Sequence, residues 1–292
     1  MRGDGPRELA QAIRSHADFV EAACGFTGDY LQWRGRLGVL NKVLSNLGRE
    51  RLLEHTSYLR FSRGEPGNPH GATFERLAAL SMARDDIGAR AARTALRLAQ
   101  TAGLLAPMRS LSDARLRIFE PTDALLAMTR EVYVMAFGIF DHLAPGLGVS
   151  VAMRDRPEFL LEVLGRLGRT FLKARIRPHE RVDVYNALLR LDGGRAILTT
   201  AVDCYWRGED LPTSQEIARQ FYVSPSQIRA VIKHAEALGL MRTAKRGRLL
   251  DAARLAETHL DAMSRFLAVL ASYGLGLSPQ TFAARRLGDG SK

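Results

Sequence analysis

Apolar side chains recur at three- and four-residue steps along most of the chain, the spacing that places them on one face of a helix. In the first half, this pattern predicts helices over residues 8–23, 29–61, 73–83, 88–102 and 122–142. In the second half, it predicts helices over residues 157–172, 178–191, 194–207, 213–221, 225–238 and 252–273. The chain is therefore expected to be mainly α-helical.

Two short segments interrupt the helical pattern and favour β-hairpins. Residues 106–122 have turn residues in their middle and alternate apolar with basic side chains towards their end, and residues 241–250 contain a turn glycine. Each segment follows a pair of short helices closed by a glycine, Gly103 or Gly239, and precedes a long apolar helix. The same order in both halves indicates an internal repeat.

The sequence APGLGVS, at residues 144–150, is the best candidate for a domain boundary. The expected division has two domains, residues 1–143 and 157–284, with a linker over 144–156 and a flexible tail over 285–292. The part of each domain that holds the short helices and the hairpin is called its head, and the heads are expected at about 73–120 and about 194–250. The Met and aromatic stripe at 128–140 is expected to be core, with a ligand pocket between the long helices as the alternative.

Residues 211–250 carry the most specific pattern. Thr213 or Ser214 can cap a first helix, and Ser224 and Pro225 are favoured at the start of a second. Apolar residues on the second helix predict a buried face, and the face left exposed holds Ser226, Gln227, Arg229 and Lys233. The following hairpin places four cations around Gly247 with no acidic residue between them: Arg242, Lys245, Arg246 and Arg248.

This segment resembles the winged helix-turn-helix of bacterial transcription regulators, and most closely the reading head of the GntR type. The resemblance rests on Glu216-Ile217-Ala218, Val223-Ser224, Arg229 and Gly239-Leu240. It implies a recognition helix that enters the major groove of duplex DNA and a basic wing that contacts phosphates. In that family the head is usually N-terminal, whereas here it lies near the C-terminus, so the family's effector domain is not implied.

A second head emerges when Gly103-Leu104 is aligned with Gly239-Leu240, an offset of 239 − 103 = 136. The apolar positions then coincide as Val223/Ile87, Ile228/Ala92, Val231/Ala95 and Ile232/Leu96. The exposed positions coincide as Ser226/Arg90, Arg229/Arg93 and Lys233/Arg97. The arrangement expected is a pseudo-dimer, similar to a MarR-type dimer but within one chain: two winged helices with short β-wings, joined by long helices.

The charge of the chain supports a polyanionic partner. Lys and Arg number 42 against 31 Asp and Glu, which gives a net charge of +11.

Cys24 and Cys204 lie in no CxxC pattern, which fits a reducing cytosol and predicts neither disulfide nor zinc site. Residues 179–183, HERVD, lack the second histidine of a zinc protease motif, and no phosphate loop or nucleophile elbow is present. No enzyme activity, cofactor, metal or membrane span is expected.

We therefore interpret the sequence as a sequence-specific, double-stranded DNA-binding transcription regulator of the nucleoid, acting as a monomer (pseudo-dimer) or homodimer, with RNA polymerase or another regulator as a further partner. Base contacts are assigned to Ser226, Gln227 and Arg229, and phosphate contacts to Lys233, Arg242, Lys245, Arg246 and Arg248. The first head would use Arg90, Arg93 and Arg97, with Arg115 and Arg117 on its wing. The alternatives are a plasmid- or phage-type replication initiator and a winged-helix scaffold that binds protein.

Overall fold

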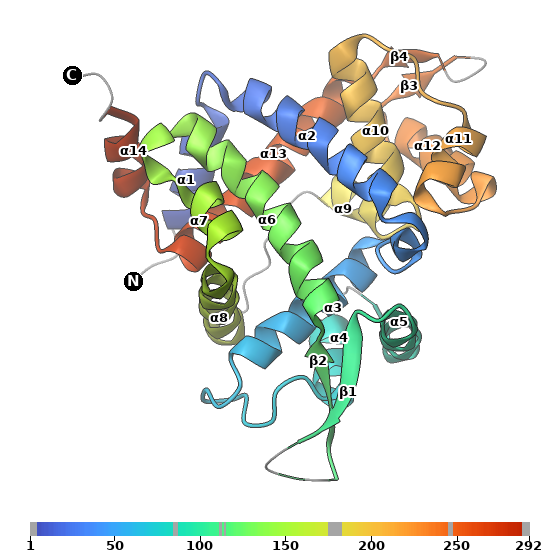
Figure 1. Cartoon of the computed structure of the whole chain (residues 1–292). Helices are drawn as coiled ribbons and strands as arrows, with labels where there is room; N and C mark the ends of the chain where they lie inside the picture. Colours follow the sequence, from blue (N-terminus) through green and yellow to red (C-terminus); the bar gives the residue numbers. More distant parts are fainter. Residues whose placement is uncertain are drawn as a thin grey trace.

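The computed structural model describes residues 5–83, 87–110, 113, 115–174, 183–244 and 248–287. Within these ranges the protein is mainly helical, with two small antiparallel sheets of two strands each (Figure 1). This confirms the expected fold class at the level of a helical protein with two short hairpins. No helix of the described residues is both long and apolar enough to span a bilayer.

The described residues of the first half form six α-helices, one 3₁₀ helix and one hairpin. They are α1 (Gly5–Arg14), α2 (Phe19–Arg36), η1 (Gly38–Lys42), α3 (Leu47–Phe61), α4 (Phe74–Ala83), α5 (Ala89–Thr101), β1 (Leu105–Arg109), β2 (Arg117–Pro121) and α6 (Asp123–Leu143). From α4 onward these bounds agree with the sequence-based predictions to within one or two residues. Residues 63–71 form a loop, in which the Asn68 amide donates to the Leu59 carbonyl at 2.7 Å.

The second half begins with η2 and ends with a short C-terminal helix. Its elements are η2 (Pro145–Leu147), α7 (Val149–Asp155), α8 (Pro157–Ala174), α9 (Asp183–Leu189), α10 (Gly194–Arg207), α11 (Ser214–Phe221), α12 (Pro225–Ala237), β3 (Arg242–Thr243), β4 (Leu249–Asp251), α13 (Ala253–Val269), the π-helical η4 (Leu270–Leu275) and α14 (Pro279–Leu287). Residues 175–182, which include most of HERVD and the expected helix start at Pro178, lie outside the described residues.

The helix predicted over residues 29–61 is wrong, because the chain turns between α2 and α3. Asn41 is fully buried there, and its side-chain amide donates to the carbonyls of Arg34 at 2.7 Å and Gly38 at 3.1 Å. These bonds satisfy the end of α2 and stop its propagation. The helix predicted over residues 8–23 is likewise divided, since α1 ends at Arg14 and α2 starts at Phe19.

The segment expected to be a linker, residues 144–156, instead holds η2 and α7. The Asp141 carboxylate, near the end of α6, accepts hydrogen bonds from the backbone N–H groups of Val149 and Ser150, both at 2.8 Å. This caps α7 and folds it back against α6. The tail expected from residue 285 also begins inside α14, and residues 288–292 lie outside the described part of the chain.

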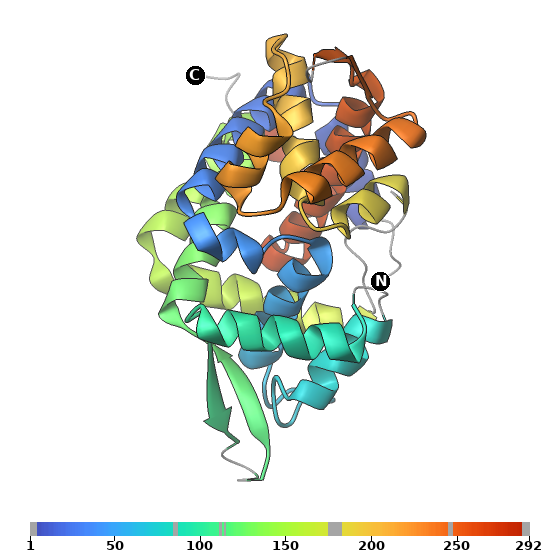
Figure 2. The same ribbon diagram turned by 90° about the vertical axis from the view of Figure 1, so that its right-hand side faces the viewer.

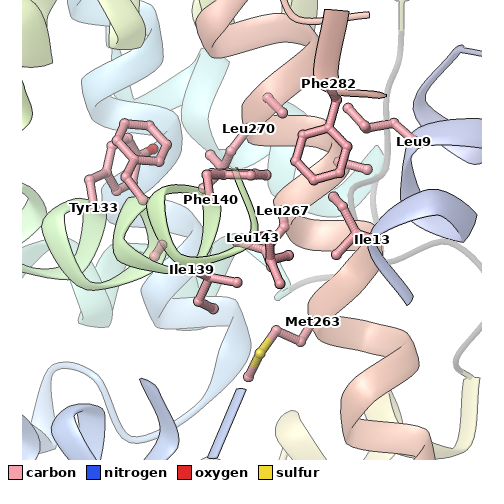
Figure 3. Close-up of a cluster of buried hydrophobic side chains, with 14 of the residues drawn as sticks. Leu9, Ile13, Tyr133, Ile139, Phe140, Leu143, Met263, Leu267, Leu270 and Phe282 are labelled. Carbon is pink, nitrogen blue, oxygen red and sulfur yellow. The ribbon is translucent and has the colours of Figure 1, made fainter. Parts of the chain in front are cut away.

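Within the described residues three apolar clusters form the core, and the one drawn in Figure 3 is built extensively from both halves. The shared cluster combines α1 and α6 with α13, η4 and α14, and Figure 3 shows Phe140 and Phe282 within it together with Leu9 and Leu267. The other two clusters lie under α4–α5 and under α11–α12. The two halves are therefore fused through a common core rather than tethered by a flexible connection.

Candidate nucleic-acid interface

The two predicted heads have the same order of elements. In each, a pair of short helices leads into a hairpin: α4, α5, β1 and β2 in the first head, and α11, α12, β3 and β4 in the second. A helix precedes each pair, α3 or α10, and a long helix follows each hairpin, α6 or α13. In the first head, Thr73 forms an additional β-bridge with Ile118, which adds a third short edge to the hairpin.

The alignment at an offset of 136 is supported by backbone geometry. Gly103 and Gly239 both have positive φ, +73° and +65°, a conformation that glycine adopts without the steric cost of a Cβ. In both heads the next leucine donates its N–H back into the helix, Leu104 to Ala99 O at 2.9 Å and Leu240 to Ala235 O at 3.0 Å. The same helix terminus is thus built twice from matched residues.

Burial along the aligned helices agrees with the same register. Ala92, Ala95 and Leu96 are buried in α5, as are Ile228 and Val231 in α12. Three expected core positions are only half-buried: Ile87, Val223 and Ile232. The outward faces of α5 and α12 therefore correspond position by position.

Both helices of the second head begin with a reciprocal cap. Glu216 Oε2 accepts from the Thr213 N–H at 2.7 Å while Glu216 N–H donates to Thr213 Oγ at 3.2 Å. These bonds lower the pKa of the Glu216 carboxyl, with the Thr213 backbone N–H as the main cause. Ser224 and Gln227 form the second cap, at 3.2 Å and 2.8 Å. Between the caps, Tyr222 adopts a left-handed conformation, φ +56°.

The exposed face of α12 holds three of the residues predicted to contact DNA in the second head. Ser226, Arg229 and Lys233 are all exposed. Arg242 and Arg248 are exposed on the adjoining hairpin, whereas Lys245 and Arg246, predicted at its tip, lie outside the described residues. The acidic residue of α12, Glu236, is directed to the hairpin, since it accepts from Thr243 N at 2.9 Å and from Thr243 Oγ1 at 2.8 Å.

Gln227 differs from the other residues predicted to read bases. It is half-buried, its Oε1 accepts the Ser224 N–H, and its Nε2 donates to Asp192 Oδ2 at 3.2 Å. Both ends of its amide are therefore engaged within the protein. Gln227 positions the start of α12, and a base contact would require these bonds to be exchanged.

The first head presents a more uniformly basic face. Arg90, Arg93 and Arg97 are exposed on α5, which contains no acidic residue. The Arg93 guanidinium lies 4.6 Å from the centre of the Phe74 ring, a cation–π contact that holds it against α4. Arg115 and Arg117 are exposed on the hairpin.

The sequence-based prediction missed Arg109, which is exposed on β1 and pairs with Arg117 across the hairpin. The alternation that identified Arg115 and Arg117 on β2 is absent from β1, where four non-polar residues precede Arg109. Two cations directly opposite one another on an antiparallel pair repel, so an anionic partner between them would be stabilising.

The charges on these faces are unneutralised. Within the described part of the chain, none of the exposed cations on α5, α12 and the two hairpins forms an ion pair with an acidic side chain. Many arginines elsewhere are paired with carboxylates, including Arg14, Arg34, Arg60, Arg156, Arg195 and Arg207. Among the described residues, the cations on the faces of the two heads thus have no carboxylate partner within the protein.

The helices α5 and α12 lie on the same side of the protein (Figures 1 and 2). In Figure 2, α5 lies across the lower half of the face towards the viewer and α12 lies across its upper half. The hairpins project at opposite ends, β1–β2 at the bottom and β3–β4 at the top (Figures 1 and 2). A single extended ligand running along this side could contact both helices.

A polar junction fixes the second head to the first half of the chain between these faces. Asp192, which precedes α10, accepts from Ser45 Oγ and Asn46 Nδ2, both at 2.7 Å, and from Gln227. The Gly193 N–H also donates to Ser45 O at 2.8 Å. The Asp192 junction thus links the start of α3 to the start of α12.

Comparisons of the chain with family models, curated proteins and solved structures gave no match. The described residues contain no group of three or more His, Cys, Asp or Glu side chains arranged to hold a metal ion.

Proposed function

We propose that the protein is a sequence-specific, double-stranded DNA-binding transcription regulator that uses two winged helix-turn-helix heads in one chain. The observation that carries the proposal is the matched pair α5 and α12: the same buried register, the same glycine-closed end, and an unneutralised cationic face in each. Duplex DNA is a polyanion with a groove wide enough for a helix, so it fits both the charge and the shape of these faces.

The element order of each head supports the same proposal. In winged-helix proteins a recognition helix enters the major groove and the following hairpin lies on the flanking backbone. Here α5 and α12 would be the recognition helices. Exposed Ser226 and Arg229 on α12 would contact bases, and Lys233, Arg242 and Arg248 would contact phosphates. Arg90, Arg93 and Arg97 would serve α5, with Arg109, Arg115 and Arg117 on its hairpin.

The fusion through one core fits a reader of two half-sites. A dimeric regulator of this kind contacts half-sites about one helical turn, ~34 Å, apart. In this chain the shared core and the Asp192 junction would set the spacing of the two heads without dimerisation. Because the exposed residues of α5 and α12 differ, the proposed target is asymmetric.

The first test is the salt dependence of DNA binding. Lys233→Ala should weaken binding to every duplex by about tenfold, or about 1.4 kcal/mol, and reduce the slope of log K against log salt by ~1. The matched control is Arg154→Ala, which removes one exposed cation from α7 on the opposite side of the molecule. Equal effects of the two substitutions in fluorescence anisotropy would contradict the proposed face.

The second test is genome-wide occupancy of the tagged protein and of its Arg229→Ala/Lys233→Ala variant. Discrete promoter peaks that disappear in the variant would support a regulator that reads DNA through α12. A single dominant peak over tandem repeats would identify a replication initiator instead. Absence of any peak would contradict DNA binding and support a scaffold that binds protein.

A further inference from the structure

The long helices enclose a pocket of about 190 Å³ near the centre of the molecule. Its walls come from α2, α3, α6, α8, α9, α10 and α13, so both halves contribute. An apolar cavity of roughly 150 Å³ is known to take up a benzene ring. The pocket therefore has room for one small ring system of one or two fused rings.

The walls of the pocket are unusually aromatic. Phe26, Tyr30 and Trp33 follow one another along α2, with Phe26 and Tyr30 stacked at 5.8 Å and Tyr30 and Trp33 at 5.4 Å between ring centres. Tyr133, Tyr185 and Phe266 also contribute, together with Met128 and Met263. Flat aromatic faces and adaptable thioethers are suited to enclosing a planar ring.

Most polar groups at the pocket already have partners within the protein. Glu50 accepts from Arg34 at 3.0 Å and from Arg195 at 2.7 Å. Burial lowers the pKa of Arg195, but the charge of Glu50 outweighs it and the pKa is raised overall. His259 and Tyr185 bond each other at 2.6 Å, and burial lowers the pKa of His259 to about 4, so the pair is uncharged. These groups need no ligand.

Trp33 is the exception. Its side chain lines the pocket, is only 4% exposed, and its indole Nε1–H has no hydrogen-bond partner within the described residues. A buried donor without an acceptor costs about 1–3 kcal/mol, so it is uncommon unless another molecule satisfies it. An acceptor inside the pocket would remove this cost.

We propose that this pocket binds a small, uncharged, planar aromatic molecule that accepts a hydrogen bond from the Trp33 indole N–H. The ring would lie among the aromatic side chains of α2, α6 and α13, and its acceptor atom would face Trp33. A charged ligand is disfavoured because the charges at the wall are balanced: Glu50 and Glu54 stand against Arg195 and Arg34, both of which bond Glu50.

The pocket also connects the two heads, which gives its occupant a regulatory role that rests on the proposed function. Glu50 belongs to α3, the helix that precedes the first head, and Arg195 belongs to α10, the helix that precedes the second. An occupant that packs against both helices changes the free energy of any movement of one head relative to the other. Its binding should therefore alter DNA affinity.

The binding test uses two matched pairs of probes that differ only by a ring nitrogen: pyridine with benzene, and quinoline with naphthalene. They are titrated at mildly alkaline pH, where the nitrogen is unprotonated, into the full-length protein labelled with ¹⁵N at its two tryptophans. At least one nitrogen-containing probe should shift the Trp33 indole N–H signal downfield and saturably. It should bind about fivefold more tightly than its hydrocarbon partner, the ratio expected from one hydrogen bond.

Two variants complete the test. Trp33→Phe identifies the Trp33 signal and should make the two members of a pair bind equally. Ala262→Met fills the pocket from α13 and should abolish binding of both, with circular dichroism and the melting temperature confirming that each variant is folded. Absence of any saturable shift, equal shifts within both pairs, or binding that survives Ala262→Met would overturn the proposal.

The regulatory step is measured separately, as the DNA affinity of wild-type protein with and without the probe that binds. A change in wild type that is lost in Ala262→Met supports coupling, and no change contradicts it. If the protein binds no DNA, the proposed function fails, while the result of the tryptophan titration still stands.

Discussion

The two heads agree on their buried side and differ on their exposed side. Gly103 and Gly239 end the two recognition-helix candidates in the same conformation, and the residues under both helices are apolar in register. The outward positions hold Arg90, Arg93 and Arg97 in the first head, but a serine, an arginine and a lysine in the second. The buried apolar positions are the same in both heads because the fold requires them. The exposed positions are not constrained by packing, so they can differ and serve binding.

The two hairpins also differ, in their length and in how they are anchored to the rest of the protein. β1–β2 pairs over five positions and is held to α3 by Glu120, which forms ion pairs with Arg60 and Arg63. β3–β4 pairs over two positions with an irregular register. The first head thus has a longer, firmly anchored basic arm, and the second has a helix with varied polar groups. We infer that the first head contributes affinity and the second contributes sequence preference.

The largest effect should come from removing the cations of α5 together. Arg90→Ala/Arg93→Ala/Arg97→Ala should reduce affinity about a thousandfold for specific and random duplexes alike, and lower the salt slope by ~3. Anisotropy titrations at several salt concentrations measure both quantities. The charge-matched control removes Arg7, Arg154 and Arg166, which are exposed on α1, α7 and α8. A loss confined to one preferred sequence would reverse the roles assigned to the two heads.

The next largest effect concerns the structure that both heads share. His259 in α13 bonds Tyr185 at 2.6 Å and lies 3.4 Å from Thr27 Oγ1 of α2. Burial, and to a lesser degree Arg195, lowers its pKa from 6.5 to about 4. As pH falls from 6.5 to 4, the unfolded chain takes up this proton before the folded protein does. The free energy of unfolding should therefore fall by about 3 kcal/mol.

Urea denaturation at several pH values measures this loss, and His259→Gln is the comparison. Carboxylates titrate in both proteins, so the difference between the two curves isolates His259. The variant should show the weaker dependence between pH 6.5 and 4. Parallel curves would mean that His259 is not held uncharged in the folded protein.

A smaller effect should distinguish the starts of the two helices. Ser224 caps α12 reciprocally with Gln227, so Ser224→Ala should reduce the free energy of unfolding by about 1 kcal/mol. Lys233→Ala, exposed further along the same helix, is the control and should have little effect on stability. If both substitutions cost the same in urea denaturation, the cap does not stabilise α12.

The smallest effect is expected at the matching end of α5. Gly88 occupies the N-cap position with extended φ −74° and ψ 163° and makes no side-chain cap. A Cβ there meets no atom within 4 Å. Gly88→Ser should therefore add a few tenths of a kcal/mol to stability, seen as a small rise in the denaturation midpoint. A decrease would show that the two helix starts differ in more than their caps.

The heads were predictable from sequence because their signals are local. Caps, closing glycines and apolar spacing define α4, α5, α11, α12 and both hairpins within a few residues. The division between α2 and α3 was not predictable, because apolar spacing continues through Leu37 and Leu44 across the turn. The turn between α2 and α3 depends on the hydrogen bonds of the buried Asn41 amide. In the sequence, Asn41 is only one polar residue within an apolar stripe, so nothing marks it as the end of a helix.

Contacts between residues that are distant in sequence account for the other differences between the predictions and the structure. Nothing in the local pattern indicates that α1 packs against α13, or that Asp192 joins Ser45 to Gln227. Consequently a linker was expected where α7 folds back on α6, and Gln227 was assigned to bases although its amide is engaged within the protein. Arg109 was missed because its strand, β1, shows no alternation of apolar and basic residues.

The shared core has a consequence for how the two heads can change over generations. In a symmetric homodimer every substitution appears twice, so an improvement in one half-site contact is imposed on the other. Here each head is encoded once and is carried by the same core as its counterpart. A mutation on α12 leaves α5 untouched, so the two surfaces can diverge without a second gene and without any period of subunit exchange.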